Sequence, residues 1–145
     1  MTGVQTCALP ISDLKVLCST RTATAAIGDA VYLMLPVTTS GKRLQGNGAS
    51  ASSDADYSGS WNAGANATAN TFGNSEIYIP NYTGSNYKSI SADSVSENNA
   101  SAAYANLFAG LWSNTAAINQ ITLIPGASAN FAQYSTATLY GILKA

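Results

Sequence analysis

The sequence of 145 residues contains no histidine and little charge, with 6 Lys and Arg and 7 Asp and Glu. Without histidine, a Ser-His-Asp triad is excluded, and a structural zinc site lacks its usual ligands. No basic cluster offers the positive surface that phosphate backbones require, so we expect no nucleic-acid partner. No apolar stretch approaches the roughly 20 residues that span a bilayer, so we expect no membrane partner.

Cysteine is also scarce, and only Cys7 and Cys18 are present. Cys7 lies in the opening MTGVQTCALPIS, which lacks the basic and apolar regions of a signal peptide and the alternation of a strand. Residues 2–11 match the translation of ACTGGAGTTCAGACGTGTGCTCTTCCGATC, part of a common short-read sequencing adapter. We therefore expect residues 1–11 to be non-native and residues 12–145 to be a single domain truncated at its N-terminus. Cys18, then alone, is expected to be a small buried side chain on a strand.

The residues that are abundant indicate an all-β protein. Hydrophobic residues make up 46% of the chain, and apolar and polar side chains alternate with period two between clusters of Gly, Asn and Ser. This pattern predicts an antiparallel β-sandwich of jelly-roll type with little helix. A Gly/Ser-rich loop is expected over residues 46–60. Strands are expected within residues 13–20, 28–36, 71–80, 86–95 and 103–114, and a last pair within 116–126 and 130–142, joined by a turn at 125–127.

The segment AYANLFAGLWSN, residues 103–114, carries apolar side chains on both faces of its predicted strand. Alternation places Leu107, Ala109 and Leu111 on one face. The other face has three aromatic residues, and we interpret it as a candidate subunit interface. These candidate interface residues are Tyr104, Phe108 and Trp112.

Aromatic residues near amides and acids suggest a second kind of site. Sugar rings stack on aromatic side chains while neighbouring polar groups take their hydroxyls. One candidate glycan platform comprises Tyr57 and Trp61 beside Asp54, Asp56 and Asn62, and a second comprises Tyr82 and Tyr87. The alternative is that Trp61 fills the core of the sandwich and the tyrosines lie along strand edges.

The acidic residues do not form a convincing catalytic or metal site. Asp54 and Asp56 can offer oxygens to Ca²⁺, but a calcium loop normally supplies more ligands around a glycine-shaped turn. A catalytic thiol at Cys18 would need a histidine partner, which the chain lacks. We therefore predict no catalytic residues, no metal and no cofactor, so the protein is not expected to be an enzyme.

Six blocks of the sequence resemble a family of small structural proteins of tailed bacteriophages, known mainly from environmental sequences and described as virion or tail-associated proteins. Together they cover most of residues 13–142. The blocks are DLKVLCSTRT, LQGNGASASS, ANATANTFGNSEIYIPNYT, KSISADSV, GLWSNTAAINQITLIPG and FAQYSTATLYGI.

The resemblance implies a β-sandwich module of the virion, in a tail fibre or another surface appendage, made in the cytoplasm of the host bacterium. Its expected partners are further copies of itself, with a trimer favoured, other virion proteins and a host surface polysaccharide. Family members carry one or two strands before the block that begins at Asp13. We therefore expect the native first strand or strands to be missing and the fragment to be unstable, because about three inward side chains stabilise a fold by roughly 5–9 kcal/mol. The alternative function is a carbohydrate-binding module of a secreted bacterial protein.

Overall fold

The computed structural model describes residues 10–36, 39–55, 58–98 and 103–143. Within these residues, no helix is long and apolar enough to cross a membrane. A short 3-10 helix, η1 (Gly126–Ser128), is followed by the last strand. In chain order the strands are β1 (Ile11–Thr20), β2 (Gly28–Met34), β3 (Thr39–Gly46), β4 (Ala51–Ala55), β5 (Ser58–Ala63), β6 (Gly73–Ile79), β7 (Lys88–Glu97), β8 (Ala103–Trp112), β9 (Thr122–Pro125) and β10 (Thr136–Leu143).

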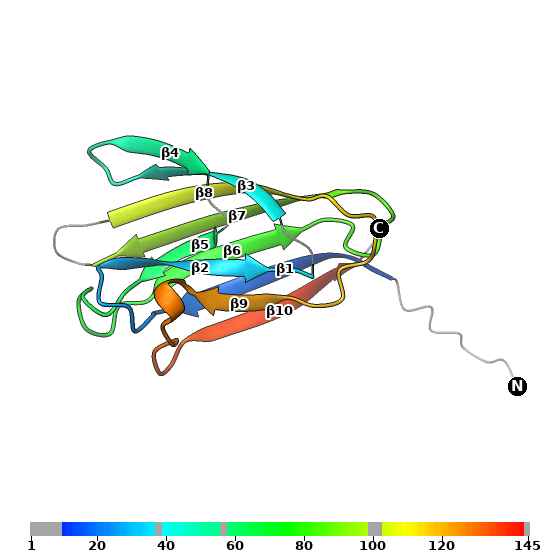
Figure 1. The fold of residues 1–145 in the computed structure, drawn as a ribbon. Helices are drawn as coiled ribbons and strands as arrows, with labels where there is room; N and C mark the ends of the chain where they lie inside the picture. Colours follow the sequence, from blue (N-terminus) through cyan, green and yellow to red (C-terminus); the bar gives the residue numbers. More distant parts are fainter. Residues whose placement is uncertain (1–9, 37–38, 56–57, 99–102, 144–145) are drawn as a thin grey trace, which may run out of the picture.

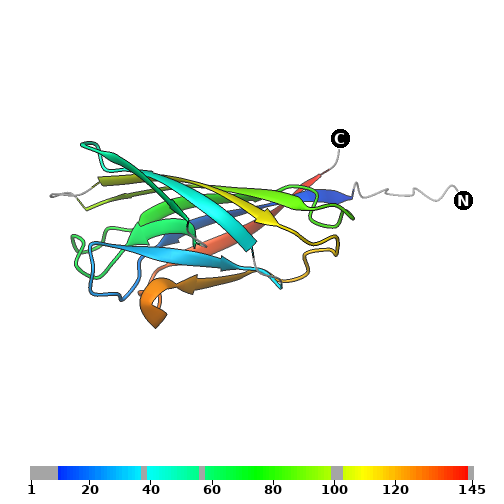
Figure 2. The same cartoon turned by 45° about the horizontal axis from the view of Figure 1, so that its top comes forward.

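The strands form two sheets that pack face to face (Figure 1). The larger sheet has the order β10-β1-β6-β7-β8-β3-β4, and the smaller has the order β5-β2-β9. Figure 2 shows the smaller sheet as a separate layer beneath the larger one. All pairings between these strands are antiparallel. The prediction of an all-β antiparallel sandwich is therefore confirmed.

The core lies between the two sheets and follows the alternation that the sequence predicts. In β7, buried and exposed residues alternate along the whole strand. Cys18 of β1 is buried and unpaired, which confirms its prediction as a small core side chain. The core cluster comprises Leu14, Val16, Cys18, Leu33, Leu35, Ile77, Ile79, Ile90, Ala92, Phe108, Trp112 and Ile118.

Arg21, directly after β1, fixes the loop between β5 and β6. Its guanidinium donates hydrogen bonds to four main-chain carbonyl oxygens of that loop. Nη1 lies 2.7 Å from the oxygen of Thr68 and 3.0 Å from that of Thr71. Nη2 lies 3.0 Å from the oxygen of Ala65 and 2.9 Å from that of Ala67. Hydrogen bonds from an ionised donor are stronger than neutral ones, so this one side chain organises the loop.

Two predicted connections are wrong. Residues 46–60 were expected to form a loop, but they contain β4 and parts of β3 and β5, and β4 pairs with β3 over residues 42–46. The strands β9 and β10 do not pair with each other, because β9 pairs with β2 in the smaller sheet and β10 with β1 in the larger. The segment that begins at η1 therefore carries the chain from one sheet to the other.

The smaller sheet covers only part of the larger one. Every residue of β10, the edge strand of the larger sheet, is exposed. Leu139 lies opposite Val16 in the register, so the two side chains share the inner face. Val16 is buried, whereas Leu139 is 57% exposed. The sandwich is thus open beneath β10, while β1 is paired on both sides, by β10 and β6.

Candidate functional site

The first predicted glycan platform is dispersed in the structure. Asp56 and Tyr57 lie outside the described residues, and Asp54 lies in β4, where its backbone pairs with that of Arg43. Asn62 is completely buried in β5, where its Oδ1 accepts a hydrogen bond from Thr20. The prediction for Asn62 is corrected, because a side chain in the interior cannot meet a sugar hydroxyl.

Trp61 is half-buried and packs against side chains of the larger sheet. The guanidinium carbon of Arg43 lies 4.8 Å from the Trp61 ring centroid, and the Tyr104 ring centroid lies 6.2 Å away. A Cβ at Gly28 would lie 2.2 Å from the Trp61 Nε1, so only glycine leaves room for the indole on that side. With these neighbours around it, Trp61 fills space between the sheets, which is the alternative that the sequence had left open.

The second predicted platform, Tyr82 and Tyr87, lies in the loop between β6 and β7. Tyr82 is half-buried and packs against the core cluster, whereas Tyr87 is 57% exposed. The loop is tied down next to Tyr82, because the Asp13 carboxylate accepts hydrogen bonds from the Asn81 backbone amide and from the Tyr78 hydroxyl. These two bonds lower the pKa of Asp13 below its usual value, and the bond to Asp13 raises that of Tyr78. The loop thus presents one exposed aromatic ring, Tyr87, and not a pair.

The predicted interface on β8 is corrected as well. Phe108 and Trp112 are buried within the chain, with 7% and 1% of their surface exposed, and Tyr104 is half-buried beside Trp61. Side chains that fill the core of one chain are not available to a second copy. The large apolar residues of β8 that do reach the surface are Leu107 and Leu111, which alternation places on the face opposite to the aromatic residues.

Lys88, which the sequence analysis did not single out, is buried beneath Trp112. Only 1% of its surface is exposed, and its Nζ lies 4.7 Å from the Trp112 ring centroid. Nζ donates hydrogen bonds to the carbonyl oxygens of Gly84, at 2.5 Å, and Ala116, at 2.7 Å. Burial lowers the pKa of Lys88. Lys88 lies two residues before Ile90, and alternation places both side chains on the inner face, so the sequence indicates that Lys88 is buried.

The outer face of the larger sheet, the side turned away from the smaller sheet, carries an apolar strip centred on β8. The strip consists of Leu44, Val95, Ala105, Leu107, Ala109 and Leu111, which the register places side by side on β3, β7 and β8. Leu107 is 56% exposed and Leu44 is 52% exposed. Alternation along β8 indicates these apolar residues but does not indicate that their face is the uncovered one.

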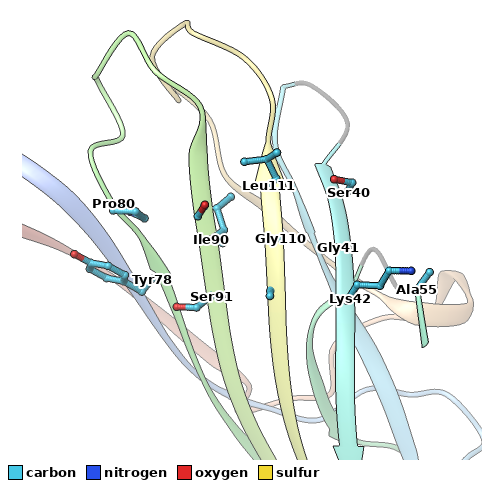
Figure 3. Close-up of a pocket in the computed structure, with 12 residues that line it drawn as sticks. Ser40, Gly41, Lys42, Ala55, Tyr78, Pro80, Ile90, Ser91, Gly110 and Leu111 are labelled. Carbon is cyan, nitrogen blue, oxygen red and sulfur yellow. The ribbon is translucent and has the colours of Figure 1, made fainter. Parts of the chain in front are cut away.

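A shallow hollow of ≈ 700 Å³ lies at one end of this strip. Small residues of β7, β8 and β3, among them Ser91, Gly110 and Gly41, line the hollow (Figure 3). Tyr78 lies at one side of the hollow, Leu111 lies on β8 between the neighbouring strands, and Lys42 extends from β3 toward Ala55 of β4. The hollow is open and holds no convergent set of titratable groups. It can receive a protruding side chain but lacks the enclosure of a small-molecule pocket.

Charged residues flank the apolar strip with opposite signs on its two sides. Glu76 of β6 forms an ion pair with Lys15, at 2.7 Å, and lies opposite Asp93 of β7. On the far side, Lys42 of β3 is exposed. Neither Asp93 nor Lys42 has an ion-pair partner among the described residues. The outer face is therefore acidic on its β7 side, apolar along β8 and basic on its β3 side.

The described part of the chain holds no cluster of three or more His, Cys, Asp or Glu residues that could bind a metal ion. Burial raises the pKa of the Cys18 thiol, so this cysteine is not an activated nucleophile. The chain matches no protein-family model, no curated protein and no solved structure in the comparisons made. The outer face of the larger sheet is consequently the candidate functional surface.

Proposed function

We propose that the chain is a non-enzymatic structural protein of a tailed-bacteriophage virion, and that it acts in assembly by packing against copies of itself through the outer face of the larger sheet. The observation that supports this proposal is the exposed apolar strip on β3, β7 and β8. Contiguous apolar surface on a soluble protein usually marks an interaction site. Sparse charge on the strip also suits an interface, since charged residues are depleted in interface cores.

The virion assignment draws on the sequence resemblance and on composition together. A chain with 9% charged residues and no histidine has few groups for catalysis but many small side chains that pack closely. The block KSISADSV forms most of β7, and GLW ends β8, so two of the resembling blocks border or form the apolar strip.

Host-glycan adhesion and the alternative of a carbohydrate-binding module stay predictions from the sequence. Of their candidate residues, Asn62 is buried and Trp61 packs within the sandwich, while Tyr87 is exposed without a second exposed ring beside it in the described residues. No arrangement of described side chains favours either function, so the proposal is limited to assembly.

A matched pair of leucine variants tests the assembly role. Leu107, on the strip, and Leu139, on the inner face of β10, are 56% and 57% exposed. We expect the unaltered chain to self-associate at micromolar concentration in light scattering after size-exclusion chromatography. Leu107→Asp should make it monomeric, because a charge is then buried without a partner, and Leu139→Asp should leave the association unchanged. A chain that is strictly monomeric before any substitution contradicts the proposal.

The virion assignment has a separate test in the genes that flank the coding sequence. Terminase, portal and tail genes are expected beside it. Glycoside hydrolase genes in their place would favour the carbohydrate-binding module and count against the virion proposal.

A further inference from the structure

The charges on the outer face are arranged in a way that fits a second copy of the same face. The strand register places Ser91 of β7, Ala109 of β8 and Lys42 of β3 next to one another in one row across the sheet. The next row on the same face, two residues away along each strand, consists of Asp93, Leu107 and Leu44. Asp93 and Lys42 thus lie on opposite sides of β8 and one row apart, and each is an exposed charge with no ion-pair partner among the described residues.

We propose that two copies of the chain pack outer face to outer face about a two-fold axis parallel to β8, with Lys42 of each copy pairing with Asp93 of the other. This arrangement rests on the proposed function, because it specifies how the assembling face is used. A two-fold contact uses the same patch on both copies, so every contact occurs twice. Each dimer therefore contains two Lys42–Asp93 pairs.

The direction of the axis follows from the sign of the flanking charges. A two-fold axis parallel to the strands places β7 of one copy over β3 of the other, so Asp93 approaches the basic side of its partner. A two-fold axis in the same plane but perpendicular to the strands places β7 over β7, and Asp93 then approaches a second Asp93. Like charges brought together in an interface oppose association. Of these two axes, the one along β8 brings acid to base while keeping the apolar strips in contact.

The hollow gives the lysine a place to lie in this arrangement. With the axis along β8, Lys42 of one copy lies over Ser91 of the other, and Ser91 lines the hollow of ≈ 700 Å³. Asp93 follows two residues along β7, about 7 Å away. Packed sheets are about 10 Å apart, and the flexible four-carbon stem of lysine can bridge this gap and reach the neighbouring row.

Charge reversal tests the arrangement. Lys42→Asp and Asp93→Lys, each alone, should weaken self-association at least tenfold in sedimentation velocity, because each homodimer then contains two like-charge contacts. An equimolar mixture of the two variants should recover association to within about threefold of the unaltered chain, since both contacts then join opposite charges. The double variant Lys42→Asp/Asp93→Lys should recover it as well. Thermal unfolding should be nearly unchanged, because both residues are exposed.

A control separates pairing from net charge. The double variant Lys42→Asp/Thr138→Lys adds a positive charge on β10, away from the strip, and should associate as weakly as Lys42→Asp alone. If the single variants associate like the unaltered chain, or if their mixture fails to recover, the two-fold arrangement is wrong. A trimer likewise overturns the arrangement but leaves the proposed function intact. If the unaltered chain shows no self-association at all, the proposed function itself is refuted.

Discussion

The two faces of β8 carry similar side chains and have different surroundings. Phe108 and Trp112 are buried against the smaller sheet, whereas Leu107 and Leu111, on the same strand, face solvent. Alternation divides a strand into two faces but does not say which of two apolar faces is covered. That choice depends on the neighbouring strand: in β7 the inner positions include Ile90 and Ala92, and the outer positions beside them hold Ser91 and Asp93. One apolar face of β8 thus fills the core, and the other is left exposed.

Removing the largest inner side chain of β8, Trp112, should lower the free energy of unfolding more than any other substitution below. Trp112→Ala is expected to lower the free energy of unfolding by about 3–5 kcal/mol, because it leaves a cavity in the core and uncovers the Lys88 amine. Leu111→Ala, its neighbour on the outer face, is the matched control and should cost far less. Urea denaturation of the monomer measures both, and equal losses would abolish the distinction between the faces.

Replacing Asp13, an acid that is hydrogen-bonded to Tyr78, should have an intermediate effect on the free energy of unfolding. Asp13→Asn weakens the bonds from Tyr78 and from the Asn81 amide and is expected to cost about 1 kcal/mol at neutral pH. The pKa of Asp13 is lowered in the folded chain, so the carboxylate contributes stability above its unfolded value of 3.8. This contribution is lost as the pH falls through the lower folded value.

The measurement for Asp13 is the free energy of unfolding of both proteins as a function of pH. The difference between them should be constant at neutral pH and should shrink in acid. A difference independent of pH would mean that charge plays no part in this contact.

The smallest effect on stability is expected on the apolar strip. Leu107→Ser should change the free energy of unfolding by no more than about 0.5 kcal/mol, since Leu107 is 56% exposed. Measured at concentrations where the chain is monomeric, a loss of 2 kcal/mol or more, an order typical of core truncations, would show that the outer face also supports the fold.

Alternation was enough to predict the strands that build the core. β1, β2, β7 and β8 each have inner side chains that recur every second residue, and the structure contains each of them. The hairpin of β3 and β4 has no such signal, because LQGNGASASS offers mainly Gly, Ala and Ser. β3 is held by main-chain pairing to β8, and β4 at the edge of the sheet by pairing to β3, and this pairing depends on the whole fold.

The candidate glycan residues show that proximity in the sequence does not determine which side chains meet in the folded protein. Trp61 and Asn62 were grouped because they are adjacent in the sequence. Both contact the larger sheet, Asn62 through Thr20 of β1 and Trp61 through Arg43 of β3 and Tyr104 of β8. These partners are far from β5 in the sequence, so only the fold brings them together. Lys88 was missed for a related reason, since a lysine is normally expected in solvent. Its buried position depends on two carbonyl groups supplied by separate loops.

The contact of Arg21 with the loop between β5 and β6 has a consequence for how this loop can change. The guanidinium binds carbonyl oxygens of the main chain, and every amino acid supplies such an oxygen. These four bonds do not depend on the side chains of the loop, whereas Arg21 itself cannot be replaced by lysine without losing the planar fork of donors. One cation thus ties the path of this loop to the end of β1 through the main chain.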